Sequence, residues 1–504
     1  MYIGYDIKNG VKYAKICKSY REGGKVKTKQ VSLGRVVDEK AGIYRNRKRG
    51  VFTYDLKTDT YGEPPSDAEI PVIQRKNAQE KLILDFGSTH FLDRYIVQSG
   101  LLRAIHAMHY GNKDSLFALL QYYIQCNMAN YNAAEWLEGS YARILYPKAN
   151  LESQRISNIL ASIGQEASYR DFFREYMKLL KHRDGEDILI DSTGLPNSIH
   201  FPLTAVSCHN GQISNEVRLI YVVQQGTNLP LYFRYVAGNI IDVSTLTKTI
   251  LELKAQNINT RFAILDAGYL TKENTEELLR NKISFVTRMR ENSSLYQKLV
   301  EEHLPTLCSE ENLVSYNSRY IYLKRIECEL LPGHKGYAYL GMDLAMRSME
   351  ASKLFENAGS MKLTEAQVHQ QLRRKGVFVL VATRPVAKEK ILPLYYTRQQ
   401  IEQVFDISKN NTNLLPLRVH DEDTFRGHLL LSFVAAIICK KLQDDLKETP
   451  FTPENALLAL RNHKCKVFES EVITMEATKK ANTLYKKFRI KVEHTYPIQR
   501  CKCS

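Results

Sequence analysis

The hydrophobic pattern of this chain changes its period near Gly185. Before that point, from about residue 74 to 181, apolar residues recur every three or four positions, as in "FLDRYIVQSGLLRAIHAMH" and "SLFALLQYYIQCNM", which predicts helices. After it, short apolar runs alternate with amphipathic stretches in the order β, β, β, α, β, α, β. This change restricts the second half of the chain to an α/β fold with a mixed sheet flanked by helices.

The elements after Gly185 can be read in turn. The strands and helices are "DILIDSTG", the hairpin "EVRLIYVVQQGTNLPLYFRYVAG", "DVSTLTKTILELKAQN", "RFAILDAGY", "TKENTEELLRNK" and "ISFVTRMR". Residues 291–375 interrupt this order with the strand-like "RYIYLKRIECELL" and "KGYAYLGM", and "GVFVLVATRP" then resumes a buried strand. A long helix over about 394–410 and an apolar core helix near 427–443 follow. The most apolar stretch of the second helix, Leu429 to Cys439, is about half the roughly 20 residues that a membrane span needs. Three antiparallel strands followed by parallel strands with right-handed crossovers is the layout of an RNase H-like core, here with a β-rich insertion at 291–375.

The first 55 residues differ from the rest in charge and pattern. The chain has a formal net charge of +16, and residues 1–50 hold 14 Lys or Arg against four Asp or Glu. Alternating residues with turn signals at Asn9-Gly10 and Gly23-Gly24 predict a small β-meander. A polyanionic partner is favoured, although charge alone does not separate DNA from RNA or an acidic membrane surface, and a solvated basic edge strand is the alternative. The basic residues that we expect to contact nucleic acid are Lys25, Lys27, Lys29, Arg47, Lys48 and Arg49.

Two aspartates follow apolar strands of the predicted core. Asp191 closes "ILIDSTG" and Asp266 closes "AILDAGY". Functional groups gather at the ends of parallel strands, and the small residues after each aspartate leave space for a ligand. The alternative for either residue alone is a carboxylate that caps a turn or helix.

Four polar residues share one face of the predicted helix "YYTRQQIEQVFDISK": Tyr395, Arg398, Glu402 and Lys409. At about 100 degrees per residue, the last three fall within a stripe roughly 40 degrees wide. The alternative is an exposed helix face with an ordinary Arg-Glu ion pair at a spacing of four.

With these residues in place the chain resembles insertion-sequence transposases of the DDE class, in the branch with a β-rich insertion and the signature Y-x2-R-x3-E-x6-K. Tyr395, Arg398, Glu402 and Lys409 match every position of the signature. The resemblance covers roughly residues 185–445, and the basic opening resembles one group within the branch. It implies a catalytic core at 185–290 and 376–445, a helical DNA-binding domain at 74–181, and a homodimer on DNA. Tyr395 is implied as a further phosphate contact.

The resemblance also implies an activity. The enzyme would bind the terminal repeats of a mobile element in double-stranded DNA, cleave the ends and join the 3′-hydroxyls to target DNA. Two divalent ions about 4 Å apart stabilise the attacking and leaving oxygens of such a reaction, and Mg²⁺, with Mn²⁺ as a substitute, prefers oxygen ligands. Asp191, Asp266 and Glu402 would supply the carboxylates. Arg398 and Lys409 are suited to gripping the phosphate.

Several alternatives stay open. A DNA-binding protein descended from a transposase but catalytically silent would keep the same residues, and an RNase H-like nuclease without strand transfer would share the site. Residues 446–504 are expected either to contact a second copy or to be a packing extension. The only tryptophan, Trp136, lies outside the insertion, so whether a DNA hairpin intermediate forms is not decided. Nine scattered cysteines and no apolar span or leader indicate a reducing cytoplasm. The resemblance to insertion-sequence transposases implies a nucleoid-associated prokaryotic protein.

Overall fold

The computed structural model describes residues 1–8, 11–64, 82–180, 187–197, 201–209, 212–240, 245–255, 258, 260–358, 364–417 and 419–498. The chain divides into two compact units, Met1–Gln79 and Glu80–Ser504, which are described separately. Some predicted features lie outside the described residues. They are the Asn9-Gly10 turn, residues 74–81 at the start of the helical segment, and Cys501 and Cys503, two of the nine scattered cysteines.

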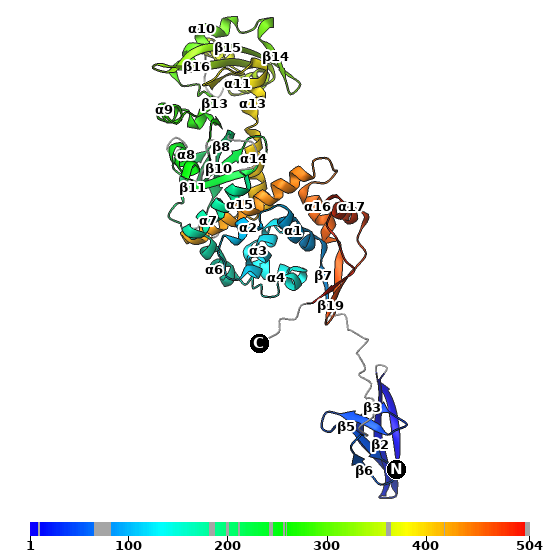
Figure 1. The fold of residues 1–504 in the computed structure, drawn as a ribbon. Coiled ribbons are helices and arrows are strands. Elements are labelled where there is room, and N and C mark those ends of the chain that lie inside the picture. Colours follow the sequence, from blue (N-terminus) through cyan, green and yellow to red (C-terminus); the bar gives the residue numbers. More distant parts are fainter. Residues whose placement is uncertain are drawn as a thin grey trace. The chain divides into compact units, whose positions relative to one another are not determined.

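The first unit is a six-stranded antiparallel meander (Figure 1). Its strands are β1 (Tyr2–Lys8), β2 (Val11–Glu22), β3 (Lys25–Asp38), β4 (Ile43–Asn46), β5 (Gly50–Asp55) and β6 (Thr60–Gly62). A small core of Ala14, Ile16, Leu33, Tyr44, Phe52 and Tyr54 holds it together. Every second residue of β5 is buried, so the alternation in the sequence follows the two faces of the sheet.

The second unit is built around a ten-stranded mixed sheet. Its strands are β8 (Asp187–Pro196), β9 (Ala205–His209), β10 (Gln212–Gln224), β11 (Pro230–Ala237), β12 (Phe262–Leu265), β13 (Ser284–Arg288), β14 (Leu313–Tyr316), β15 (Arg319–Leu331), β16 (His334–Asp343) and β17 (Val377–Ala382). Their order is β11-β10-β8-β12-β13-β17-β16-β15-β14, with β9 beside β10. Strand β12 runs parallel to β8 and β13, and the other neighbours are antiparallel. The predicted α/β class with a mixed sheet flanked by helices is confirmed.

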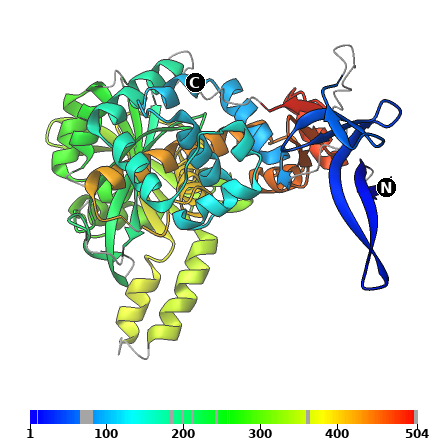
Figure 2. The same ribbon diagram turned by 90° about the horizontal axis from the view of Figure 1, so that it is seen from below.

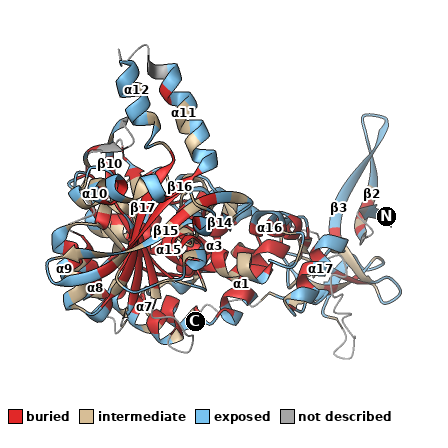
Figure 3. Ribbon diagram, turned by 90° about the horizontal axis from the view of Figure 1, so that it is seen from above, coloured by how far each residue is buried: buried red, intermediate tan, exposed pale blue. Residues whose placement is uncertain are grey.

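Burial explains why the central strands carry continuous apolar runs. All residues of β12 and β17 are buried, as Figure 3 shows for the interior of the sheet. A strand covered on both faces needs apolar side chains at every position, whereas a strand with one solvated face alternates. Helix α9 (Lys272–Arg280) connects the parallel strands β12 and β13, and α8 (Leu246–Ala255) precedes β12.

The segment between β13 and β17 extends the same sheet. Strand β17 pairs antiparallel with β13 on one side and with β16 on the other, so β14 to β16 continue the hydrogen-bonded ladder. Helix α10 (Ser294–His303) precedes these strands, and α11 (Leu344–Ala358) and α12 (Glu365–Leu372) follow them. Figure 2 shows α11 and α12 as a pair that extends away from the sheet.

Helices α1 to α7 precede the sheet, and two of them contact a long buried helix. The helices before the sheet are α1 (Gly87–Gln98), α2 (Leu102–His106), α3 (Lys113–Gln125), α4 (Ala133–Gly139), α5 (Ala142–Leu145), α6 (Ser153–Ile163) and α7 (Glu166–Leu180). Helix α15 (Glu422–Asp445) contacts α3 and α6 and is buried along most of its length. None of the helices in the described part of the chain is long and apolar enough to cross a membrane.

The C-terminal segment packs against the start of the second unit. Helix α16 (Pro453–Arg461), β18 (Lys464–Val467), β19 (Glu471–Thr474), α17 (Lys479–Lys487) and β20 (Thr495–Pro497) form it. Its strands make a sheet in the order β20-β19-β18-β7, where β7 is Leu82–Asp85. Segments that precede and follow the central sheet in the sequence therefore share one small sheet.

The long helix predicted over 394–410 is wrong, because the structure breaks it in two places. Helix α13 (Lys388–Tyr396) ends before α14 (Gln399–Asp406), and a π-helical turn at Ile407–Asn411 follows. Pro393 lies inside α13 and has no N–H to donate, and the Thr397 hydroxyl donates to the Leu394 carbonyl oxygen at 2.6 Å. The Arg398 N–H reaches back only three residues, to the carbonyl of Tyr395, at 3.1 Å, which tightens the backbone between the helices.

Candidate active site

Asp191 and Asp266 occupy equivalent positions on neighbouring strands. The parallel pairing of β8 with β12 ends at Ile190 opposite Leu265, so each aspartate is the next residue on its strand. Asp191 does not close its strand as predicted, because β10 pairs with β8 as far as Pro196. The two carboxylates nevertheless start from the same edge of the parallel pair, which explains how residues 75 positions apart come together.

The space beside Gly194 is not left for a ligand, contrary to the expectation. A Cβ atom at Gly194 would lie 2.1 Å from the Glu216 carboxylate, whose residue is 5% exposed. Glu216 lies 3.6 Å from the guanidinium of Arg218. Glycine at this position therefore makes room for a buried ion pair on the adjacent strand β10.

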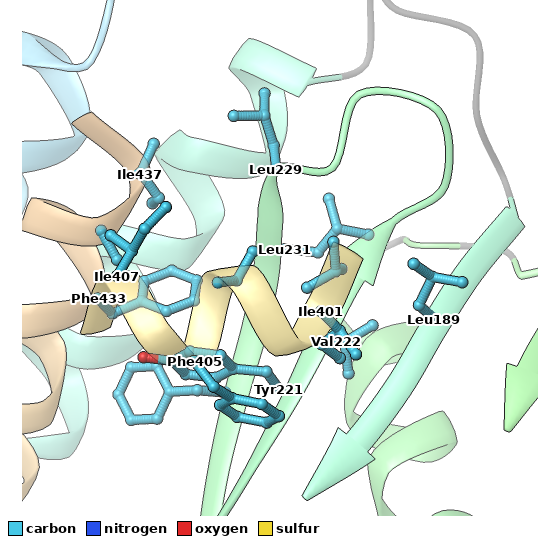
Figure 4. Close-up of a cluster of buried hydrophobic side chains, with 14 of the residues drawn as sticks. Leu189, Tyr221, Val222, Leu229, Leu231, Ile401, Phe405, Ile407, Phe433 and Ile437 are labelled. Atoms are coloured by element: carbon cyan, nitrogen blue, oxygen red, sulfur yellow. The ribbon is translucent and has the colours of Figure 1, made fainter. Parts of the chain in front are cut away.

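Helix α14 is fixed over the sheet by contacts with β10, as Figure 4 shows. Tyr221 lies opposite Asp191 in the strand register, and its ring stacks on Phe405 with centroids 5.0 Å apart. The Tyr221 hydroxyl also lies 3.1 Å from the Ser408 hydroxyl. Since Glu402 is one turn before Phe405, these contacts set the position of Glu402 relative to Asp191.

Arg398 contacts all three predicted carboxylates. Its guanidinium forms an ion pair with Asp266, lies 4.0 Å from Asp191 and lies 3.5 Å from Glu402. Burial lowers the pKa of the guanidinium, but Asp191, Asp266, Tyr395 and Glu402 together raise it, so the net pKa is raised. The exposed fraction of the side chains rises from 13% for Asp191 to 40% for Asp266 and 58% for Glu402, so the group opens toward solvent on the Glu402 side.

The other two signature residues take different positions. The Lys409 ammonium donates to the Thr193 hydroxyl at 2.6 Å and to the Gly194 carbonyl at 3.1 Å, so it is held on β8. Burial lowers the pKa of this amine, and Glu216 opposes that shift. Tyr395 is buried, which raises its pKa to about 12, and its ring lies 5.9 Å from the Arg398 guanidinium. All four residues adjoin the site, although they do not share one straight helix.

Two arginines at the end of β13 were not singled out in the sequence. Arg290 donates to the carbonyl oxygens of Ala267 at 3.2 Å and Gly268 at 2.9 Å, and so holds the turn that follows Asp266. A cavity of about 130 Å³ adjoins Glu402, and its lining residues are Arg288, Phe378, Leu380, Tyr395, Tyr396, Arg398, Gln399 and Glu402. The sequence "VTRMR" could have indicated these arginines. It ends a strand parallel to β12, and parallel neighbours end at the same edge of a sheet.

The remaining predicted contact residues belong to the first unit. Lys25, Lys27 and Lys29 lie on the exposed part of β3, and Arg47, Lys48 and Arg49 form the turn between β4 and β5. The Asn46 side chain accepts from the backbone N–H groups of Lys48 and Arg49, which fixes this turn.

The aromatic residues Trp136, Tyr337 and Tyr339 have structural contacts. Tyr339 of the insertion is fully buried, and its hydroxyl donates to the Val386 carbonyl and accepts from the Val386 N–H, both at 2.7 Å. Trp136 packs edge-on against Tyr122 with centroids 5.6 Å apart. Tyr337 is partly buried against the core.

The donor set fits a divalent cation in its chemistry. Three carboxylates share one cationic partner, Arg398, and carboxylate oxygens are the ligands that Mg²⁺ prefers. In the described part of the chain, no three His, Cys, Asp or Glu side chains lie close enough together to hold one metal ion as they stand.

Fold and site together define an α/β protein with a carboxylate cluster at the ends of two parallel strands and basic groups on the helix above it. A family model described as the transposase DDE domain matches residues 182–438, just over half of the chain. The chain belongs to this transposase family, which confirms the resemblance to insertion-sequence DDE transposases.

Individual relatives are distant. The transposase for insertion sequence element IS231F from Bacillus thuringiensis subsp. israelensis is 22% identical over 256 residues, which cover 44% of this chain and 51% of that protein. The match therefore spans about half the length of this curated relative. A solved structure of a piggyBac transposase synaptic complex with hairpin DNA has a TM-score of 0.39 and 11% identity over 74% of this chain and 76% of that chain.

Proposed function

We propose that this transposase binds the terminal repeats of its element in double-stranded DNA, cleaves phosphodiester bonds at the ends and joins the 3′-hydroxyls to target DNA. The observation that carries the proposal is the convergence of Asp191, Asp266 and Glu402 on one guanidinium. Carboxylates that repel one another are not brought together without a cationic partner, and a site of this kind suits two-metal chemistry. The strand order β11-β10-β8-β12-β13 supports an RNase H-like core.

Asp191, Asp266 and Glu402 would hold two Mg²⁺ or Mn²⁺ ions. Bound divalent ions supply charge stabilisation for the attacking and leaving oxygens. The burial gradient suits a substrate that approaches from the Glu402 side, because Asp191 is the deepest of the three and Glu402 the most exposed.

Basic residues of the chain would hold the DNA phosphate. The planar Arg398 guanidinium can donate two parallel hydrogen bonds to a phosphate. It contacts Asp266 and also lines the cavity beside Tyr395. Lys409 offers a point charge anchored to Thr193 at 2.6 Å, and Thr193 lies two residues after the proposed metal ligand Asp191, on the same face of β8. Tyr395 would donate a hydrogen bond to the same phosphate, since its raised pKa keeps the hydroxyl protonated at neutral pH.

The further assignments are proposals of the same kind. Residues 1–55 and the helical segment 74–181 would bind the terminal repeats, residues 185–290 and 376–445 would form the catalytic core around the insertion 291–375, and two copies would pair on the DNA. The pairing of β18 with β7 shows part of 446–504 packing within one chain, so a dimer contact would come from the outer surface of that segment.

The test uses the full chain and labelled duplex DNA that carries the element's own terminal repeat, with Mg²⁺ or Mn²⁺. Wild type should cut at the end of the repeat, whereas Glu402→Gln should bind with unchanged affinity and cut at least about 100-fold more slowly. Glu448→Gln removes an exposed carboxylate outside the site and should cut like wild type.

Each other outcome has a defined meaning. Specific binding without cleavage in wild type, under conditions that permit end pairing, would indicate a catalytically silent DNA-binding protein. Cleavage without joining of the 3′-hydroxyl to target DNA would indicate a nuclease. Cleavage by Glu402→Gln at the wild-type rate would show that Glu402 does not take part in catalysis.

A further inference from the structure

The outer part of the β2–β3 hairpin is a two-stranded ribbon that is exposed on both faces. All residues from Ser19 to Ser32 are exposed, whereas Ala14, Ile16 and Leu33 at its base are buried (Figure 3). The base also contains a register shift between Ala14 and Lys15, at a point where Gly34 has a φ of +95°. Isolated two-stranded ribbons are marginally stable, so this length of unpacked ribbon is explained better by a partner than by folding.

A two-residue turn, Gly23-Gly24, connects the two strands at the tip of the ribbon. Gly23 and Gly24 both have positive φ, +62° and +78°, and connect Glu22 to Lys25, which are paired in the register. Two consecutive residues with positive φ match the right-handed twist of a hairpin without splaying its strands. The ribbon thus stays narrow to its end.

The strand register gives the two faces of the ribbon different chemistry. One face pairs Lys18 with Lys29, Tyr20 with Lys27, and Glu22 with Lys25. The other pairs Cys17 with Gln30, Ser19 with Thr28, and Arg21 with Val26. The first face is strongly basic, and the second offers directional hydrogen-bonding groups.

Among the described residues, some basic side chains of the ribbon form ion pairs within the chain, and others do not. Lys18 forms an ion pair with Asp59, and Lys27 lies 2.9 Å from Glu22. Within the described residues, Arg21, Lys25 and Lys29 have no acidic side chain within ion-pair distance. A surface with unpaired cations on a narrow projection complements a polyanion.

The dimensions suit the major groove of duplex DNA. Neighbouring strands lie about 4.8 Å apart, and the pairs from Ser19–Thr28 to Glu22–Lys25, in which both residues are exposed, extend over roughly 14 Å. Strand β3 alone stays exposed as far as Ser32, roughly 27 Å from its start. The major groove is about 12 Å wide and 8.5 Å deep and admits a two-stranded ribbon. Single-stranded nucleic acid is favoured less, because stacking platforms require several aromatic rings and this ribbon has one, Tyr20.

We propose that the ribbon Ser19–Ser32 inserts into the major groove of the terminal-repeat duplex, with the Arg21 and Gln30 face toward the base edges. The long side chains of the lysines start on the opposite, outward face and would reach around the edges of the ribbon to the phosphates at the groove walls. This inference rests on the proposed binding of terminal repeats and adds how the repeat is read. Arginine recognises guanine and glutamine recognises adenine through paired hydrogen bonds, and lysine contacts phosphate without regard to sequence.

The first measurement is affinity as a function of salt, with the full chain and duplexes of matched and scrambled sequence. Lys25→Gln/Lys29→Gln should weaken binding to both duplexes on the order of tenfold and reduce the slope of log K against log salt by about 2. The matched control Lys40→Gln/Lys57→Gln removes the same charge from two other turns of the same unit and should change the slope by less than half as much.

The second measurement is interference by methylation of guanine N7, which lies in the major groove. Wild type should show interference at one short stretch of the repeat, and Arg21→Ala/Gln30→Ala should lose it there while retaining binding to the scrambled duplex. Wild-type behaviour of both ribbon variants would overturn the inference and leave the proposed function intact if the repeat is still cut. Failure of wild type to prefer the repeat, or preference for RNA, would overturn both.

Discussion

At the scale of single residues, Arg398 dominates the electrostatics of the site. One guanidinium is the shared partner of Asp191, Asp266 and Glu402. Removing it leaves carboxylates facing one another, with Asp191 only 13% exposed, and an unpaired charge of low exposure is costly. The partial exposure of Asp266 and Glu402 to solvent reduces the loss of stability.

Arg398→Gln should therefore lower the stability of the metal-free protein by roughly 1–3 kcal/mol at neutral pH. Thermal unfolding checks this, and Mg²⁺ should raise the unfolding temperature of the variant more than that of wild type. Arg280→Gln, which breaks an exposed pair with Glu277, is the control and should cost less than about 1 kcal/mol. Equal effects of the two changes would mean that the carboxylates do not depend on Arg398.

Arg290 hydrogen-bonds to the backbone that follows Asp266. It holds two carbonyl oxygens of the turn after Asp266, and the Thr287 hydroxyl holds the carbonyl of Asp266 at 3.1 Å. Arg290 is therefore a positioning residue. Arg290→Gln should slow cleavage about tenfold or more while DNA affinity stays within twofold, because small displacements of a catalytic group are costly in rate.

Single-turnover cleavage and binding measured in parallel check this prediction, and Arg290→Lys should recover part of the rate because it can still donate to one carbonyl. A loss of DNA affinity equal to the loss of rate would instead place Arg290 on the DNA.

The sequence predicts these residues unevenly. Asp191 and Asp266 could be found because apolar runs bring each to the same edge of a sheet, and the signature spacing singles out Arg398 and Glu402. The role of Gly194 could not be found, since it depends on Glu216 from a neighbouring strand. Pairing across strands is a tertiary property that local pattern does not contain.

At the scale of elements, the crossing of α6 and α15 depends on glycine. A Cβ atom at Gly427 would lie 1.9 Å from the Leu160 carbonyl oxygen, and one at Gly164 would lie 1.8 Å from that of Asp423. Backbone atoms cannot move aside as a flexible side chain can. The two helices thus approach more closely than residues with side chains would permit.

Gly427→Ala should destabilise the second unit by about 1–3 kcal/mol, as overpacking of a dense interior does. The unfolding temperature measured by circular dichroism checks this. Gly139→Ala meets no atom within 4 Å and is the control, which should leave stability almost unchanged. A wild-type unfolding temperature for Gly427→Ala would show that the helices can separate without cost.

Elements with a clear period were predicted well, and breaks within them were not. The strand "RYIYLKRIECELL" has the bounds of β15, and the apolar helix near 427–443 is the interior of α15. The break between α13 and α14 was missed because a helical period continues across it. Pro393 and Thr397 supplied a signal, but each is also tolerated within a bent helix.

At the scale of the whole molecule, buried histidines make stability depend on pH. Burial lowers the pKa of His90, His428 and His463. His428 links three segments, since its ring lies 2.8 Å from the Tyr123 hydroxyl and 3.0 Å from the Leu414 carbonyl. Each ring is neutral in the folded state, whereas the unfolded chain binds a proton near pH 6.5.

Stability should therefore be fully present above about pH 6.5 and fall as the pH decreases below it, by up to about 1.4 kcal/mol per pH unit for each histidine. Unfolding measured from pH 7.5 to 5.5 avoids most carboxylate titration. His428→Gln should remove part of the decrease, and the exposed His369→Gln none of it. A stability that does not change over this range would mean that the three rings accept protons in the fold.

The pairing of β17 with β13 has a consequence for solubility. Without the segment from β14 to β17, β13 would be a bare edge of a sheet, with apolar Phe285 and Val286 beside unsatisfied N–H and C=O groups, which invites association between chains. The segment moves that edge outward to β14, a strand of four residues with Leu313 and Ser315 exposed. A family member shortened in this region would need some other cover for β13, such as a helix or a charged strand, to avoid aggregation.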